Sequence, residues 1–222
     1  FLMIPGSSEA ASFRKMPTTA VLDKLHAENR LALVTYPEKL RSWDANFETG
    51  VRFWRRQFTH AMLQSDMSKG RLILDSLQTE TDDVYEVSRE AIEEPKGHWY
   101  APTARSSEAI ILYLHGGGYA FHAASSQRFA AMLAHRCGAH LFAPDYRLTP
   151  EHPHPAQAED ALAAWRYVTG RTTPNKIVVV GDSAGGHMAL MLLLALSKIN
   201  LQQPALCIGL CPWTDIGNRG AS

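Results

Sequence analysis

Short, continuous apolar runs alternate with longer amphipathic segments along the second part of this chain. The runs at 109–114, 141–143, 176–180 and 205–210 are rich in Ile, Leu and Val, which is typical of buried strands. The segments between them, at 125–137, 155–168 and 188–196, have the length and apolar spacing of helices. Strands that alternate with helices predict a mostly parallel sheet with helices on both of its faces.

The pattern before residue 80 is different. Apolar positions from about 17 to 78 approximate a helical period, and Pro37 divides this region because the residue before a proline avoids the helical conformation. Near Asp82 the pattern changes, since 84–88 alternates like a half-buried strand and 98–100 resembles its partner. We therefore predict a helical region over 1–80 and an α/β domain over 81–222.

Composition and charge exclude several classes of function. The 22 Lys and Arg residues balance 22 Asp and Glu residues, which argues against nucleic acid or an anionic membrane as a partner. No apolar run reaches the roughly 18 residues of a membrane span. The three cysteines, Cys137, Cys207 and Cys211, are too few and too poorly spaced for a disulfide framework or a zinc site. We expect reduced core cysteines and a cytoplasmic protein.

The segment Gly-Asp-Ser-Ala-Gly-Gly, residues 181–186, stands between a predicted strand and a predicted helix. A tight strand–turn–helix flanked by glycines is the nucleophile elbow, which lifts a serine hydroxyl clear of the sheet edge. The N-terminus of the following helix favours a developing negative charge. The pattern therefore predicts that Ser183 is a nucleophile.

A second glycine-rich segment, His-Gly-Gly-Gly at 115–118, follows the strand predicted at 109–114. Backbone N–H groups in such a loop stabilise the oxyanion that forms when a serine attacks a carbonyl group. We expect Gly117, Gly118 and Ala184 to donate these hydrogen bonds, with Gly116 as part of the same loop. His115 is expected to brace the loop by hydrogen bonding and not to act as a base.

Other polar residues receive structural roles. Asp182 adjoins the elbow serine and points away from it, so it is not expected to be the acid of a catalytic triad. Asp145, Arg147 and Glu151 are expected to form an ion-pair and turn network. His122, His152 and His154 are expected in loops, where solvated side chains are the default and lining the entrance of the site is the alternative. Tyr119 either borders the acyl pocket or packs under a cap.

Three segments together resemble the hormone-sensitive lipase family of α/β-hydrolase esterases: His115-Gly116-Gly117-Gly118-Tyr119, Asp145-Tyr146-Arg147-Leu148-Thr149-Pro150-Glu151 and Gly181-Asp182-Ser183-Ala184-Gly185-Gly186. The resemblance implies an α/β-hydrolase fold and a serine carboxylesterase that hydrolyses short- to medium-chain acyl esters through an acyl-serine. It also implies that the N-terminal helical region forms part of a cap. Neither a metal nor an organic cofactor is implied, and a homodimer is compatible with the family.

The triad acid and histidine are the open question. Along the chain, the family order of the triad is serine, acid, histidine. After Ser183, however, the sequence contains one carboxylate, Asp215, and one histidine, His187. His187 lies four positions along the elbow helix, and Asp215 belongs to a Pro-Trp-Thr-Asp segment that has no triad role in the family. We expect an N-terminal fragment of a longer hydrolase, inactive by itself and with an exposed sheet edge at 205–210. The missing C-terminal segment would then be a separate chain, a proteolysed piece or a further tail.

A second class of function stays open. A hydrolase scaffold that lacks its histidine can serve as a non-catalytic small-molecule receptor, because a fold does not fix a function. The intact protein is accordingly expected to take a small-molecule ester as substrate or, alternatively, as a ligand.

Overall fold

The computed structural model describes residues 44–76 and 85–217, and the chain divides into two compact units, Phe1–Asp83 and Val84–Ser222. The described part of the first unit holds two helices, α3 (Ala45–Met62) and α4 (Met67–Ser76). Asp44 caps α3, because its side chain accepts a hydrogen bond from the Phe47 N–H at 2.8 Å. The helices predicted before residue 44 lie outside the described residues.

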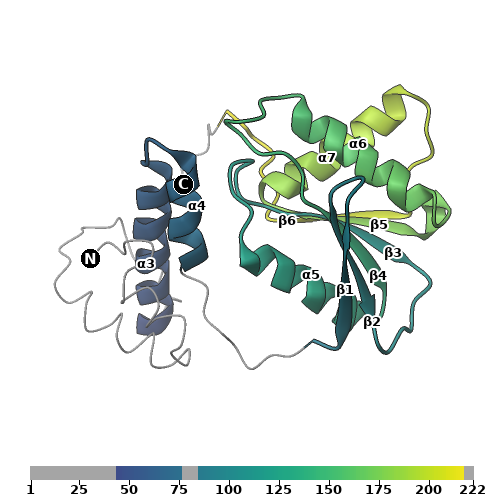
Figure 1. Ribbon diagram of the computed structural model, residues 1–222, viewed down its shortest axis with the longest axis horizontal. Coiled ribbons are helices and arrows are strands. Elements are labelled where there is room, and N and C mark those ends of the chain that lie inside the picture. Colours follow the sequence, from purple (N-terminus) through teal and green to yellow (C-terminus); the bar gives the residue numbers. More distant parts are fainter. Residues whose placement is uncertain (1–43, 77–84, 218–222) are drawn as a thin grey trace. The chain divides into compact units, whose positions relative to one another are not determined.

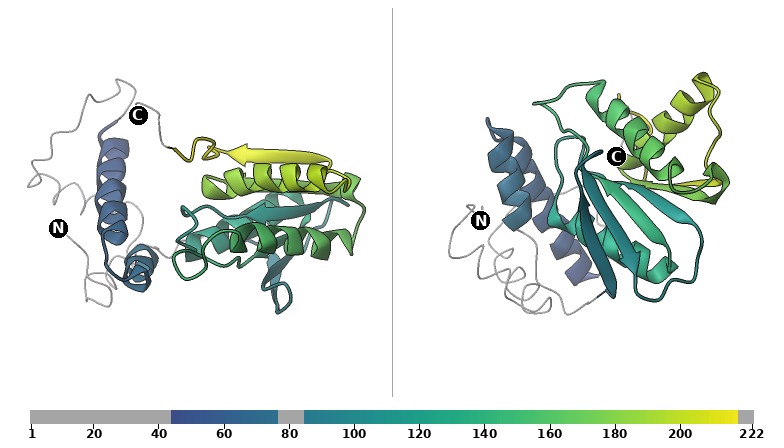
Figure 2. Two further views of the ribbon diagram at one scale, coloured as in Figure 1. Left: turned by 90° about the horizontal axis from the view of Figure 1, so that it is seen from above. Right: turned by 45° about the vertical axis from the view of Figure 1, so that its right-hand side comes forward.

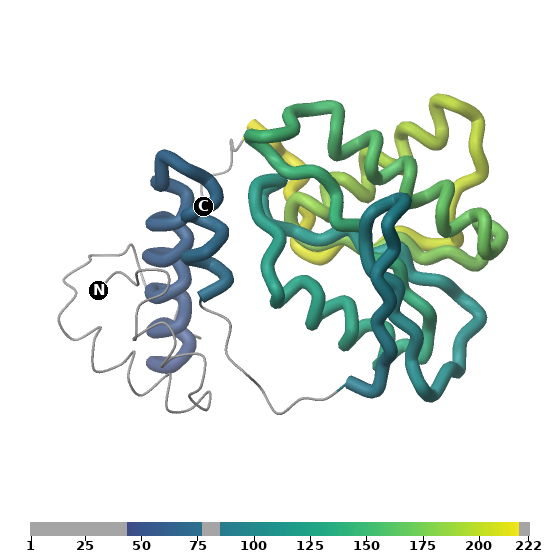
Figure 3. Tube along the Cα trace, in the orientation of Figure 1, coloured from purple at the N-terminus to yellow at the C-terminus, as the bar shows by residue number. Residues whose placement is uncertain are grey.

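The second unit is built on a six-stranded sheet in the order β1-β2-β4-β3-β5-β6 (Figure 1). Its strands are β1 (Val87–Ile92), β2 (Gly97–Pro102), β3 (Ile110–Leu114), β4 (His140–Pro144), β5 (Ile177–Asp182) and β6 (Leu206–Leu210). Its helices are α5 (Ala124–Cys137), α6 (Ala156–Thr169) and α7 (Ala184–Lys198), with a short 3₁₀ turn, η1 (Pro174–Lys176), before β5. Figure 3 traces the chain through these elements.

The four strands from β3 to β6 are parallel to one another, as the apolar runs predict. The first two strands are antiparallel, and the prediction for 84–88 was wrong at its start. β1 begins at Val87 and continues to Ile92, because the turn at 93–96 fixes a register that pairs Val87 with Pro102 and Ile92 with Gly97. Alternation alone placed Tyr85 and Glu86 in the strand, whereas both precede it.

Side chains alternate between two apolar layers on the faces of this sheet. Figure 2 shows the ribbon of the sheet and its helices from two further directions. Leu112 and Val179 belong to the core that contains Trp165 of α6 and Leu192 of α7. Tyr113 and Val180, on the opposite face, belong to the smaller core around α5. The sheet is therefore covered by α6 and α7 on one face and by α5 on the other.

β6 forms an edge of the sheet, and its side chains are more exposed than those of β3 or β5. Leu206 is 53% exposed, and Ile208 and Leu210 on the same face are exposed too, since α5 does not reach over them. All three cysteines are free thiols, as expected, and Cys207 packs partly buried against the core. The expectation of a core position was wrong for Cys137, which ends α5, and for Cys211, just after β6, because both are exposed. Within 44–76 and 85–217, no helix is both long enough and apolar enough to cross a membrane.

Candidate active site

Ser183 occupies the turn that joins β5 to α7. Its backbone is at φ 50° and ψ −117°, a conformation that costs a non-glycine residue of order 1–3 kcal/mol. Hydrogen bonds hold this turn: the Ser183 N–H donates to the Leu210 carbonyl at 3.0 Å, and its own carbonyl accepts from the N–H groups of His187 and Trp213 at 3.1 and 2.9 Å. The side chain of Ser183 is exposed at the carboxyl end of the parallel strands.

The glycine at position 185 allows this turn, because α7 begins in direct contact with the end of the neighbouring strand, β3. A Cβ atom on Gly185 would overlap the carbonyl oxygen of Leu114, the last residue of β3. Only glycine therefore lets the helix pack this closely on the sheet.

The glycine loop after β3 lies beside the elbow, because β3 and β5 are parallel neighbours with Leu114 opposite Gly181. Gly117 has φ 117°, and its carbonyl accepts hydrogen bonds from the N–H groups of Ala120 and Phe121 at 3.1 and 3.0 Å. In the described part of the chain, the N–H groups of Gly117, Gly118 and Ala184 donate no hydrogen bond. They are thus available to a ligand.

Asp182 ties the glycine loop to the elbow. Its Oδ1 accepts hydrogen bonds from the Gly116 N–H at 2.9 Å and from the Tyr113 hydroxyl at 2.7 Å. Burial and the nearby Asp182 carboxylate raise the pKa of Tyr113, so its hydroxyl stays a donor at neutral pH. The Asp182 carboxylate is used by these two contacts, which position the loop.

His115 is buried inside a stack of rings. Its ring is parallel to those of His122 and Tyr146, each with a centroid separation of 4.0 Å. Its Nδ1–H donates to the Gly116 carbonyl at 2.7 Å, and its own carbonyl accepts from the Tyr146 hydroxyl at 2.6 Å. Burial, with a smaller contribution from His122, lowers the pKa of His115 to about 3, so the ring is neutral at physiological pH.

Asp145 lies between two histidines. Its carboxylate oxygens are 3.5 Å from Nδ1 of His98 and 3.5 Å from Nδ1 of His122. The expectation that His122 is solvated was therefore wrong, because stacking on His115 keeps its side chain mostly buried.

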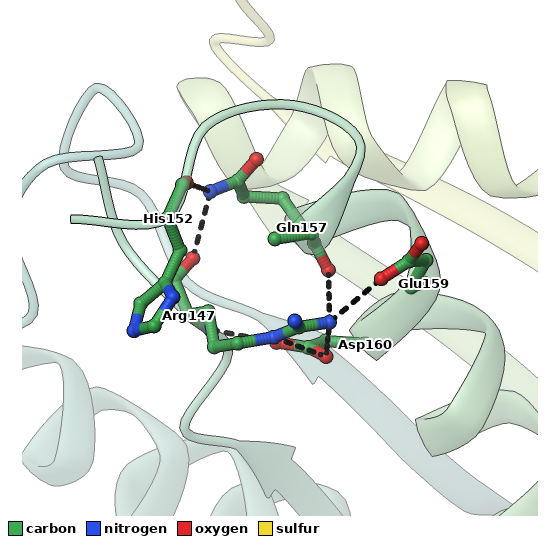
Figure 4. Close-up of polar contacts among 6 residues, drawn as sticks. Arg147, His152, Gln157, Glu159 and Asp160 are labelled. Atoms are coloured by element: carbon green, nitrogen blue, oxygen red, sulfur yellow. Dashed lines mark hydrogen bonds and ion pairs between the residues drawn. The ribbon is translucent and has the colours of Figure 1, made fainter. Parts of the chain in front are cut away.

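Arg147 fastens the loop after β4 to the first turns of α6 (Figure 4). Its guanidinium donates to Asp160 at 2.8–3.0 Å and to Glu159 at 2.9 Å. Gln157 contributes from the same helix, since its Nε2 donates to the carbonyls of Arg147 and His152 at 3.0 and 2.6 Å (Figure 4). These partners are on α6, and Arg147 does not pair with Asp145.

Two cavities flank the elbow. A cavity of about 490 Å³ lies on the α5 side and contains Ser183, with Tyr113, Ser125, Ser126, Phe129, Asp182, Leu210 and Cys211 in its walls. A second cavity, of about 530 Å³, lies on the side of α6 and α7 and includes Gly118, Tyr119, His154, His187, Met191 and Trp213. The elbow therefore has open space on both of its sides.

No side chain among the described residues hydrogen bonds to the Ser183 hydroxyl. His187, the histidine four residues later, engages Tyr119 instead, with 2.6 Å between its Nδ1 and the Tyr119 hydroxyl. Residues 44–76 and 85–217 also contain no group of three His, Cys, Asp or Glu side chains arranged to hold a metal ion.

Sequence reasoning did not find the contacts of Asp182 or the pairing of Tyr119 with His187. The first could have been found from the order of the strands. If the strands ending at 114 and 180 are parallel neighbours, the residues just beyond them, 115–116 and 182, must also be close. The second had no comparable signal, because it depends on the φ of 63° that turns the Tyr119 side chain towards α7.

Comparison with known proteins agrees with this geometry. A family model described as the alpha/beta hydrolase fold matches residues 111–222, half of the chain. An acetyl-hydrolase of Streptomyces hygroscopicus is 39% identical over 126 residues, which are 56% of this chain and 42% of that protein. An ethyl acetate hydrolase of Pseudomonas putida is 36% identical over 121 residues, 51% of this chain and 38% of that protein. The chain thus spans less than half the length of these relatives.

Solved structures lead to the same family. An esterase of the bacterial hormone-sensitive lipase family superposes with a TM-score of 0.64 at 29% identity, over 74% of this chain and 58% of that one. An esterase/lipase from an uncultured bacterium gives 0.66 at 27% identity, over 77% and 60%. The chain therefore belongs to the α/β-hydrolase fold family, and it is similar in structure to an esterase of the bacterial hormone-sensitive lipase family.

Proposed function

We propose that the whole protein is a serine carboxylesterase in which Ser183 is the nucleophile. The observation that carries this proposal is the exposed, strained Ser183 beside three backbone N–H groups that have no partner among the described residues. A protein maintains such strain where the geometry is needed for chemistry. Gly117, Gly118 and Ala184 are the proposed oxyanion donors.

The proposed reaction has two steps. The Ser183 Oγ attacks the ester carbonyl carbon while its proton passes to a general base, and the N–H groups stabilise the resulting oxyanion. The C–O bond to the alcohol then breaks, and the alcohol leaves with that proton. Water releases the acid from the acyl-serine by the same sequence. No side chain among residues 44–76 and 85–217 contacts the Ser183 hydroxyl as a base, and we propose that the 222-residue chain by itself is inactive.

Short- to medium-chain esters are the proposed substrates. The names of the two relatives above point to small acyl groups, and the two cavities beside the elbow offer about 490 and 530 Å³. We further propose that residues 1–80 form part of a cap that selects among such esters. The three free thiols support a reducing compartment such as the cytoplasm.

Labelling of the whole protein with a fluorophosphonate tests the role of Ser183. The wild type should become labelled at one serine and hydrolyse p-nitrophenyl acetate, and Ser183→Ala should lose both properties, with a loss of more than about 1,000-fold in kcat. Ser125→Ala, which changes a serine in the wall of the same cavity, should still be labelled. An unlabelled wild type that binds small esters without turnover would instead establish a receptor.

A further inference from the structure

We propose that Tyr119 and His187 form a positioning pair that fixes the glycine loop relative to the nucleophile turn. The inference rests on the proposed function, because positioning matters only if Gly117 and Gly118 act on an oxyanion. Neither residue is assigned to the reacting atoms. The pair connects the two segments that must be aligned within a fraction of an ångström for an N–H group to meet a developing oxyanion.

Tyr119 follows Gly118 directly and is held from two sides. Its carbonyl accepts hydrogen bonds from the Thr149 N–H at 2.9 Å and from the Thr149 hydroxyl at 3.2 Å. Its hydroxyl reaches His187 at 2.6 Å, and its φ of 63° is sterically unfavourable for a tyrosine. The hydrogen bonds to the carbonyl and to the hydroxyl of Tyr119 therefore stabilise its positive φ, which is unfavourable without such contacts.

His187 belongs to the first turn of α7, where its N–H donates to the Ser183 carbonyl at 3.1 Å. Its position along the helix is thus fixed relative to the nucleophile. The contacts run from Ser183 to His187 through the backbone and from His187 to Tyr119 through a side-chain hydrogen bond. Because Gly118 directly precedes Tyr119, this hydrogen bond connects the nucleophile turn to the proposed oxyanion donor.

The protonation states of Tyr119 and His187 allow a stable hydrogen bond between them. Burial raises the pKa of Tyr119 to about 12 and lowers the pKa of His187 below its ordinary value, so both groups are neutral at physiological pH. The tyrosine hydroxyl can then donate to Nδ1 of a neutral imidazole. With Nδ1 occupied and no hydrogen bond to the Ser183 hydroxyl among the described residues, His187 is placed for support and not for proton abstraction.

The test uses Tyr119→Phe, His187→Leu, the double variant and His187→Asn in the whole protein. Asn places an amide oxygen one bond from Cγ, where His has Nδ1, so it can still accept from Tyr119. Each of the first two variants should lower kcat about 10-fold with KM changed less than about two-fold, because a displaced donor costs transition-state binding. The double variant should be no worse than either single one, and His187→Asn should recover most of kcat.

Tyr167→Phe is the matched control, since it removes a tyrosine hydroxyl that has no hydrogen-bond partner among the described residues. Each variant's thermal midpoint is measured, and His187→Asn decides the matter if His187→Leu does not fold. Multiplying effects in the double variant would overturn the pairing. A loss above about 1,000-fold in both His187→Leu and His187→Asn would overturn it in favour of a base. A wild type that resists the fluorophosphonate would reject the esterase proposal itself.

Discussion

His115 shows at the scale of one residue how burial sets chemistry. The stacked rings leave its imidazole no water, so the folded protein keeps it neutral down to about pH 3, whereas an unfolded chain protonates it near its ordinary pKa of 6.5. The unfolded state therefore binds more protons than the native state between these two values. Stability must fall as the pH drops through this window.

We expect the free energy of unfolding to decrease by about 2 kcal/mol between pH 7 and pH 5 on account of His115 alone. His115→Asn keeps a side-chain N–H for the Gly116 carbonyl and does not titrate. Urea unfolding at the two pH values should show a correspondingly smaller decrease in this variant. The same pH dependence in both proteins would mean that His115 is protonated in the folded state.

At the scale of elements, the site depends on the contact between the ends of β3 and β5. The Asp182 carboxylate satisfies two donors from the neighbouring strand and loop, and the Tyr113 hydroxyl is one of them. A buried donor that loses its acceptor destabilises the fold more than the hydrogen bond itself contributed.

Asp182→Ala should therefore lower the free energy of unfolding by about 2–4 kcal/mol, since it leaves both donors without an acceptor. Asp182→Asn retains a carbonyl oxygen and should lose about half as much. Tyr113→Phe, which removes one donor, should also cost less than Asp182→Ala. Denaturant unfolding of the three variants measures this, and equal stability of Asp182→Ala and the wild type would show that the contacts contribute nothing.

The elements themselves were predictable because their short apolar runs alternate regularly with amphipathic segments of helical length. The four parallel strands and three helices of the second unit lie within a few residues of their expected positions. β1 was misplaced because a mostly exposed edge strand has a weak apolar pattern, and its register is set by the turn at 93–96. The motif at 181–186 shows the elbow in the sequence, whereas the Tyr119–His187 contact depends on tertiary geometry that no local pattern encodes.

At the scale of the whole molecule, the sheet is unevenly covered. On the α5 face, β6 presents Leu206, Ile208 and Leu210 to solvent, and no strand among the described residues pairs with its outer edge. Exposed, apolar edge strands tend to pair with other chains. The 222-residue chain should self-associate through this edge at concentrations of about 10 µM and above.

Leu206→Lys combined with Ile208→Lys should restore a monomer in size-exclusion chromatography with light scattering. Leu194→Lys, which changes an equally exposed apolar residue on α7, should have little effect. If the double variant on β6 and the Leu194→Lys variant on α7 prevent association to the same degree, association depends on general surface hydrophobicity and not on the strand edge.

The register between β3 and β5 also determines when the site can form. Its contacts join Asp182 to residues 66 and 69 positions away in the sequence, with β4, α5 and α6 between them. Contacts between such distant residues form late, because the intervening chain must first be ordered. The proposed nucleophile, Ser183, should thus stay unreactive in early folding intermediates of the whole protein, and the time at which fluorophosphonate labelling returns would measure when the central strands pair.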